Sequence, residues 1–238
     1  MSDQIYLSRL MPNLRSREAQ RDLADCMAMH RTLMSAFPDR LSSSGAARAE
    51  AGLLYRVEAL PSGAIGLLVQ SALPPDWAHL PPSWLHRDAE PQVKEITEAL
   101  GRIESGNLLR FKLIANPTRK IGTKTGADGR KNNGKRVELR GEQEWLAWLE
   151  RKAGQSGFRL KAVHAASHVP DVRSGRDLKA TGAKRGPDGS ASTLTFYGVV
   201  FEGRLEVVDV ALFQASLRAG IGPGKSYGYG LLSLAPGG

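Results

Sequence analysis

The strongest constraint on the fold is the order of the expected secondary-structure elements, because nearly the same order occurs twice. Alternating apolar residues predict strands, and apolar residues spaced three and four apart predict helices. In the first half the expected elements are a strand at Ile5–Leu10, a helix from Ser16 to Phe37, strands at Leu53–Glu58 and Ile65–Gln70, a helix at Gln92–Ile103 and a strand at Leu108–Ala115. The order is β-α-β-β-α-β.

The second half gives a similar series. Its expected elements are a strand at Arg136–Leu139, a helix at Gly141–Lys152, a strand at Phe158–His164, a strand or hairpin at Thr193–Val208, a helix at Asp209–Ala219 and a strand at Tyr229–Leu234. This order is again close to β-α-β-β-α-β, the ferredoxin-like arrangement. We therefore expect an α+β protein of two tandem ferredoxin-like (βαββαβ, RRM-like) domains, at residues 1–117 and 136–238, with a basic linker or loop at 118–135.

The positive charge is concentrated in two segments. The chain of 238 residues has 33 Lys and Arg against 24 Asp and Glu; residues 110–140 carry ten basic and two acidic side chains, and residues 151–190 carry nine and three. The second segment contains a polar insertion, Ser167–Ser192, that shows no periodicity. Two solvated loops would explain this distribution, but two separate basic segments favour a surface that binds a nucleic acid.

The composition also excludes several classes of protein. A single cysteine, Cys26, cannot form an intramolecular disulfide or a zinc site of the cysteine-rich kind. No apolar run approaches the ~20 residues that span a bilayer, and the N-terminus lacks the features of a secretion signal. His164 and His168 are expected in a strand and its trailing loop, about 13 Å apart, which argues against a shared metal. We expect a soluble, cytoplasmic protein that has no membrane contact, no cofactor and no metal.

A glycine-rich stretch lies between the last helix and the last strand. Residues 220–230 contain five glycines, Gly220, Gly222, Gly224, Gly228 and Gly230, around Lys225. A tight turn explains two or three of them, and the remainder indicate backbone that approaches an anionic ligand closely. The stretch is not a Walker A motif, because it follows a helix and precedes a strand.

This stretch makes the chain similar to a known family. The ending Gly-Ile-Gly-Pro-Gly-Lys-Ser-Tyr-Gly-Tyr-Gly resembles the signature of the repeat-associated mysterious proteins (RAMPs) of CRISPR systems, and specifically the repeat-RNA endoribonucleases of type I-E systems. Residues 1–10, Met29-His30-Arg31 through Phe37-Pro38, and Leu113–Pro117 agree with it. The similarity runs from end to end and is weakest at Ser167–Ser192.

The resemblance implies a reaction and its residues. The family cuts the CRISPR repeat at the base of its stem-loop without a metal: the ribose 2′-OH attacks the adjacent phosphate and leaves a 2′,3′-cyclic phosphate and a 5′-OH. His30 matches the family histidine, and an imidazole can act as general acid or base near neutral pH. Taken alone, a histidine on an apolar helix face is more often a core residue. Met27 replaces a tyrosine that some members have, so which group is the acid and which the base stays open.

The same resemblance gives roles to the basic residues. Lys225 is expected to contact the RNA backbone or a phosphate, and the basic segments are expected to follow the repeat stem. The candidate RNA-binding residues are Arg119, Lys120, Lys124, Arg130, Lys131, Lys135, Arg136, Arg173, Arg176, Lys179, Lys184 and Arg185. The implied partners are repeat RNA and crRNA, other Cascade subunits and, indirectly, target DNA. The alternatives are a non-cleaving crRNA-binding subunit of the same complex and a basic ferredoxin-like protein for messenger or ribosomal RNA.

Overall fold

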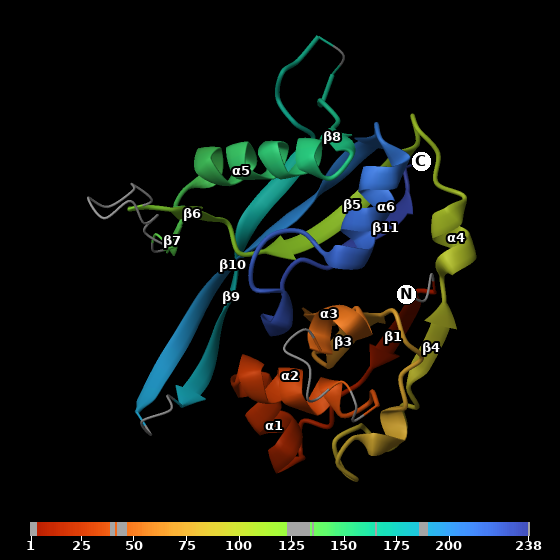
Figure 1. Cartoon of the computed structure of the whole chain (residues 1–238), viewed down its shortest axis with the longest axis vertical. Coiled ribbons are helices and arrows are strands. Elements are labelled where there is room, and N and C mark those ends of the chain that lie inside the picture. The colour runs from red at the N-terminus through yellow and green to blue at the C-terminus, as the bar shows by residue number, and fades with distance from the viewer. Residues whose placement is uncertain are drawn as a thin grey trace.

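The computed structural model describes residues 4–38, 41, 47–122, 134, 136–164, 166–185 and 190–237. Two antiparallel sheets organise these residues, one above the other in Figure 1. The elements of the first sheet come from the N-terminal part of the chain, and those of the second come from the C-terminal part.

The first sheet has four strands in the order β2-β3-β1-β4, all antiparallel. These are β1 (Tyr6–Leu10), β2 (Leu54–Ala59), β3 (Ile65–Ser71) and β4 (Gln92–Glu95). Three helices connect β1 to β2: α1 (Arg17–Ala24), α2 (Cys26–Met34) and α3 (Ala47–Ala51). A helical turn, η2 (Trp77–His79), is the only helical element between β3 and β4 in the described chain.

The second sheet repeats that order with β11-β5-β10-β8, again antiparallel. The four strands in this order are β5 (Leu108–Ala115), β8 (Phe158–Leu160), β10 (Ala191–Val207) and β11 (Leu232–Pro236), and a fifth strand pairs with β10 outside it. Helix α5 (Glu142–Gln155) connects the first two, and α6 (Val210–Ala219) connects the last two. Counted along the chain, both sheets place their strands as fourth, first, third and second, which is the expected pair of ferredoxin-like units.

Two expectations about the first half were wrong: the type of one element and the sheet to which another belongs. Residues 92–95 form strand β4, the fourth strand of the first sheet, and only Thr97–Gly101 forms a helix, α4. The strand at Leu108–Ala115 is present, but it pairs with β10 and β11 and so belongs to the second sheet. The expected division at residue 117 therefore cuts through the second unit. The periodicity is correct for Leu108–Ala115, but it carries no information about the pairing partner.

Described parts of the expected linker and of the insertion also form strands. Thr118–Lys120 (β6) and Arg136–Glu138 (β7) pair as a separate ribbon, so residues 136–138 do not open the second sheet. The basic insertion contains β9 (Val172–Arg185), which pairs with β10 along its length. Most of the described side chains of β9 are partly or fully exposed, so no buried face produces a periodic apolar pattern. In Figure 1 this hairpin leaves the second sheet and extends down towards α1 and α2.

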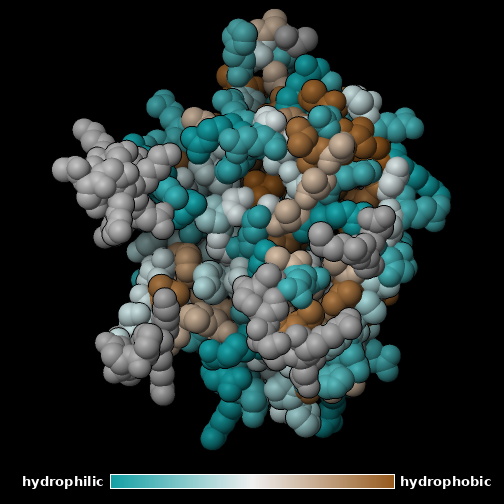
Figure 2. Space-filling view, in the orientation of Figure 1, coloured by the Kyte–Doolittle hydropathy of each residue, from teal (hydrophilic) through white to brown (hydrophobic). Residues whose placement is uncertain are grey.

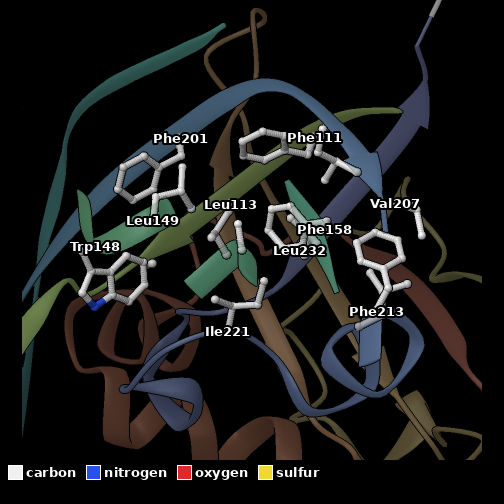
Figure 3. Packing of buried hydrophobic residues seen from close by; sticks show 14 of the residues in the cluster. Phe111, Leu113, Trp148, Leu149, Phe158, Phe201, Val207, Phe213, Ile221 and Leu232 are labelled. Carbon is white, nitrogen blue, oxygen red and sulfur yellow. The ribbon is translucent and has the colours of Figure 1, made fainter. Parts of the chain in front are cut away.

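Each unit has its own hydrophobic core. The core of the second unit, shown in Figure 3, contains Phe111, Trp148, Phe158, Phe201 and Phe213. The core of the first unit includes Trp77 and Trp84, which are 6% and 0% exposed. The two loop tryptophans therefore cover a core and are not available to stack bases.

Buried polar groups connect the two units. Arg56 of β2 is 3% exposed and donates from Nη1 to the carbonyl oxygens of Lys112 and Leu231, both at 3.4 Å. Gln70 of β3 donates from Nε2 to the carbonyl oxygen of Leu217 at 2.9 Å. These bonds satisfy groups that burial would otherwise penalise, and they fix the first sheet against the second.

The surface in Figure 2 is largely hydrophilic around α5 and the lower unit, and hydrophobic side chains gather at its upper right. Exposed apolar residues of the second unit include Leu108, Val208 and Leu212. Among the described helices, none is long and apolar enough to cross a membrane.

Candidate functional site

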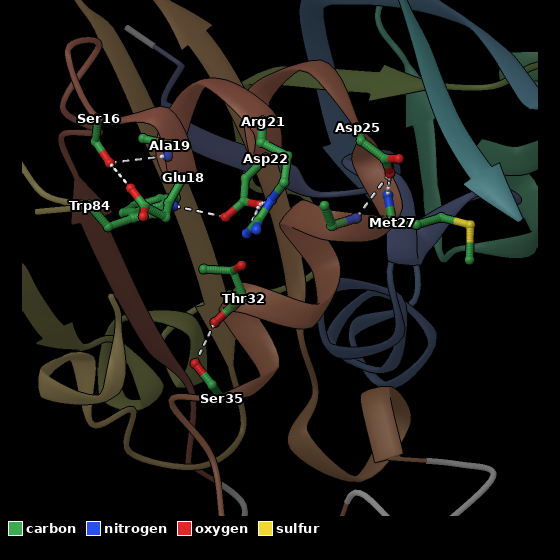
Figure 4. Close-up of polar contacts among 11 residues, drawn as sticks. Ser16, Glu18, Ala19, Arg21, Asp22, Asp25, Met27, Thr32, Ser35 and Trp84 are labelled. Carbon is green, nitrogen blue, oxygen red and sulfur yellow. Dashed lines mark hydrogen bonds and ion pairs between the residues drawn. The ribbon is translucent and has the colours of Figure 1, made fainter. Parts of the chain in front are cut away.

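The helix expected from Ser16 to Phe37 is broken at Asp25. This residue has extended backbone angles, φ −127° and ψ 107°, and ends α1. Its Oδ1 accepts hydrogen bonds from the backbone N–H groups of Met27 at 2.8 Å and Ala28 at 3.0 Å, and so caps α2 (Figure 4). Burial raises the pKa of this carboxyl, but hydrogen bonds from Ala183, Ala28 and Met27 outweigh it and lower the pKa overall. The break turns α2 away from the direction of α1, so Leu23 of α1 and His30 of α2 do not lie on one continuous helical face.

His30 lies on α2 and is partly buried. Its Nδ1 is buried and has no hydrogen-bond partner among the described residues. Burial and the nearby charges of Arg48 and Arg31 lower the imidazole pKa to about 4. The side chain is therefore neutral at physiological pH, with one nitrogen able to accept a proton.

The glycine-rich stretch runs between α6 and β11 and is anchored in the second core by Ile221, which is 2% exposed (Figure 3). All five glycines have positive φ, between 76° and 91°. At Gly224 a Cβ atom would meet Tyr229 at 2.9 Å, and at Gly228 it would meet Tyr55 at 3.1 Å. Backbone conformation and packing therefore require these glycines, so their number alone does not indicate a ligand.

Several N–H groups of this stretch are already used. Those of Ile221 and Gly230 donate to the carbonyl oxygens of Gly230 and Ile114, and that of Tyr227 donates to Gly224. The stretch contains a helical turn, η3 (Lys225–Tyr227), which packs against α2 and β2. The fold thus brings Lys225 to the helix that carries His30.

Cationic side chains connect His30 with the glycine-rich stretch. Arg48 of α3 donates from Nη1 to the carbonyl oxygen of Leu53 at 3.1 Å, and burial lowers its pKa. Arg48 and Lys225 line the same cavity of about 750 Å³, and the Arg48 charge lowers the pKa of Lys225 together with burial and Lys152. A smaller cavity, of about 330 Å³, contains His30 and Arg31 and shares Leu41 with the larger one. Arg48 was not expected from the sequence, where its only signal is a lone basic residue in a small-residue loop.

The candidate RNA-binding residues fall on two separate elements. Arg119, Lys120 and Arg136 lie on the β6–β7 ribbon. Arg173, Arg176 and Lys179 are exposed on β9, where the Arg176 guanidinium lies 5.9 Å from the Trp145 ring centre and the Lys179 ammonium 5.8 Å from that of Tyr197. The backbone of β9 also includes Lys184 and Arg185. Lys124, Arg130, Lys131 and Lys135 lie outside the described residues.

The β9–β10 hairpin reaches the start of α2. The Thr181 hydroxyl donates to the carbonyl oxygen of Ala24 at 3.2 Å, and the Ala183 N–H donates to Asp25 Oδ2 at 3.0 Å. Met27 extends towards this hairpin, and a Cβ atom at Gly182 would meet its Cγ at 2.9 Å (Figure 4). Met27 thus packs under β9.

Two further tyrosines stand near this helix. Tyr227 stacks on Phe196 of β10, with ring centres 4.6 Å apart. The Tyr55 hydroxyl donates to the carbonyl oxygen of Cys26 at 3.3 Å, and burial raises its pKa well above the usual value. Cys26 is itself buried, which raises its thiol pKa to about 11, in agreement with a packing role.

No group of three or more His, Cys, Asp or Glu residues that could hold a metal comes together in the described part of the chain. His79 and His86 are exposed, with their Nδ1 atoms 3.1 Å and 3.9 Å from carboxylate oxygens of Asp76 and Asp88. His164 and His168 are also exposed, on either side of the turn that follows β8.

Comparison with known proteins identifies the family of this fold and site. Residues 5–236 match the model of the CRISPR associated protein family. The chain therefore belongs to the CRISPR-associated proteins.

Two curated relatives narrow this assignment. The CRISPR-associated endoribonuclease Cse3 of Thermus thermophilus is 37% identical over 98% of this chain and all of its own length. The CRISPR system Cascade subunit CasE of Escherichia coli (strain K12) is 33% identical with the same coverage. Among solved structures, Thermus thermophilus Cse3 bound to an RNA that represents a pre-cleavage complex is 36% identical with a TM-score of 0.72, covering 98% of this chain and all of that one.

Proposed function

We propose that the protein is a CRISPR repeat-RNA endoribonuclease that cuts precursor transcripts at the base of the repeat stem-loop. The observation that carries the proposal is His30, neutral and partly buried on α2 beside the Lys225 turn, in a chain 37% identical to a named endoribonuclease over its full length. After cleavage the protein retains the crRNA within a Cascade-type effector complex, as the name of the CasE relative supports.

The proposed reaction uses the hydroxyl of the RNA itself. Neutral His30 accepts the proton of the ribose 2′-OH, whose oxygen attacks the adjacent phosphorus. The bond to the 5′-oxygen of the next nucleotide breaks and that oxygen takes up a proton, leaving a 2′,3′-cyclic phosphate and a 5′-OH. Lys225 and Arg48 supply positive charge for the developing negative charge on the phosphate oxygens. Burial and the charges of Arg48 and Arg31 depress the basicity of His30 in the free protein, and a bound phosphate would offset the effect of the charges.

The proposed RNA surface combines the β6–β7 ribbon with the β9–β10 hairpin. Exposed cations on both elements would contact phosphates of an A-form stem, which proteins recognise mainly by shape. We place this activity in the cytoplasm, with crRNA, the other Cascade subunits and, through them, target DNA as partners.

A non-cleaving crRNA-binding subunit is the second candidate, because Met27, which packs under β9, stands where the family resemblance leads us to expect a tyrosine. Incubation of the protein with labelled repeat RNA in EDTA distinguishes the two candidates. The endoribonuclease cuts the RNA in EDTA and leaves a cyclic phosphate, and a single 2′-deoxy nucleotide just upstream of the cut blocks cleavage without abolishing binding. Uncut RNA that stays bound to the protein identifies the structural subunit. A strict requirement for Mg²⁺, or normal cleavage of the 2′-deoxy substrate, would contradict the mechanism.

A further inference from the structure

A basic cavity that Lys225 also lines, separate from the pocket of His30, has no role in the reaction described above. It has a volume of about 400 Å³ and lies between the C-terminal half of α5 and the start of the glycine-rich stretch. Its cations are Arg136 of β7, Arg151 and Lys152 of α5, and Lys225. None of the described residues that line it is acidic.

The charges in this cavity act on one another. Burial together with Arg151 and Arg136 lowers the pKa of Lys152, and burial together with Arg48 and Lys152 lowers that of Lys225. Lys152 donates from Nζ to Gln155 Oε1 at 3.0 Å, a neutral partner. Several cations gathered without an acidic neighbour in the cavity create a positive potential that favours an anion.

Shared lining residues connect this cavity with the site of His30. Lys225 lines both this cavity and the larger one that contains Arg48. The larger cavity in turn shares Leu41 with the pocket of His30. A line of positive charge therefore passes from Arg136 and α5 over Lys225 and Arg48 to the imidazole.

The shape and lining of the cavity restrict its ligand. A volume of about 400 Å³ holds a short piece of one strand, whereas an A-form duplex is far too wide. The aromatic ring that lines it, Trp148, is 2% exposed and stacked on Phe201, so its face is not free for a base. Backbone phosphates are then the group that these side chains can contact, and base sequence is not read.

We propose that Arg151 and Lys152, together with Arg136 and Lys225, bind phosphates of the single-stranded RNA that flanks the repeat stem-loop and so fix the strand that runs through the His30 site. This inference rests on the proposed endoribonuclease function and extends it from the stem to the flanking strand.

The test compares the variant Arg151→Gln/Lys152→Gln with wild type on three labelled RNAs: the stem-loop alone, and the stem-loop with a short single-stranded extension on its 5′ or its 3′ side. Wild type binds one of the extended RNAs more tightly than the stem-loop. In the variant this advantage falls by on the order of tenfold. The slope of log K against log salt for that RNA falls by about 1.4, because each lost single-strand phosphate contact contributes about 0.7.

The control variant Lys94→Gln/Arg102→Gln removes the same charge from β4 and the end of α4, at the right-hand edge of Figure 1 and away from the cavity. It retains the advantage of the extended RNA. Equal advantages in wild type and in the α5 variant would overturn the inference, as would an advantage that depends on the base sequence of the extension. Failure of wild type to bind or cut any of the three RNAs would instead refute the proposed function.

Discussion

The two halves of the molecule have the same strand order but complete it differently. In the second half helix α6, capped by Asp209, connects the third strand to the fourth and covers the sheet. In the first half the corresponding segment, residues 72–91, has only the turn η2, and Trp77 and Trp84 fill the core. Their indole N–H groups donate to Ser8 Oγ at 3.1 Å and Asp22 Oδ2 at 2.9 Å. Two large side chains with satisfied polar atoms can therefore replace a helix.

The first crossover differs as well. In the second half α5 is one helix of fourteen residues, whereas in the first half this crossover contains α1, α2 and α3, and Asp25 separates α1 from α2. The interrupted crossover carries His30 and meets both the glycine-rich stretch and the β9–β10 hairpin. The uninterrupted helix carries Arg151 and Lys152 in its C-terminal half. In the proposed function, α2 carries the chemistry and the second unit carries the contacts with the RNA backbone.

The sharpest test of this division is His30→Ala. We expect single-turnover cleavage to fall by about 10²–10⁴, the contribution of a general acid or base, while RNA affinity changes little. The matched control is His79→Ala, which removes an exposed imidazole from the same half. A His30→Ala protein that cuts at the wild-type rate would place the chemistry elsewhere.

The variant Trp84→Ala tests whether the two tryptophans take the place of a helix in the first core. The side chain is fully buried, and its loss also leaves Asp22 Oδ2 without the indole donor. We expect the free energy of unfolding to fall by about 3–5 kcal/mol in urea titrations. Trp148→Ala in the other core is the comparison. If Trp84→Ala cost less than about 1 kcal/mol, the loop would not be a structural substitute for α6.

A comparison of Asp25→Ala with Asp209→Ala tests what the break between α1 and α2 contributes to stability. Both carboxylates cap a helix, and loss of either cap should cost about 1 kcal/mol of unfolding free energy. Asp25 also accepts from Ala183 of the hairpin, so its variant should lose a further ~1 kcal/mol. Equal losses in the two variants would show that the hairpin bond contributes nothing to stability.

The smallest expected effect concerns the pKa of His30. NMR titration of the imidazole in the RNA-free protein should give a pKa of about 4, and Arg48→Gln should raise it because a neighbouring positive charge is removed. The folded pKa lies below the unfolded value, so between about pH 6.5 and 4 the unfolded state binds the proton and the folded state does not. Wild type should therefore lose stability relative to His30→Ala as the pH falls through that range. A pKa near 6.5 in both proteins would mean that neither burial nor Arg48 acts on the imidazole.

Much of the fold can be predicted from local sequence. The features that cannot be predicted in this way depend on pairing between strands that are distant in the sequence. Strands β2 and β3, the helix after Asp209 and helix α5 were predicted because period and capping are local properties. The pairing of β5 with the second sheet was not, since its alternation is the same on either sheet. Strand β9 was missed because its exposed basic side chains give no apolar period.

The candidate site shows the same limit. The glycines were singled out by their density, and His30 and Lys225 were given their roles by resemblance to a family, which carried no distances. Arg48, Arg151 and Lys152 were missed because only the packing of α3 and α5 against the glycine-rich stretch brings them towards it. The abundance of glycine was interpreted as a sign of a ligand, whereas positive φ at all five positions accounts for it.

The pairing of β5 with both β10 and β11 also fixes an order of events during synthesis. The first sheet is complete once residue 95 has left the ribosome, because β4 is its last strand. The second sheet waits for residues 232–236, which pair with β5. The glycine-rich stretch is held between α6 and β11, so it reaches α2 only after residues 232–236 have been translated. A nascent chain would then bury its N-terminal core first and acquire the surroundings of His30 later.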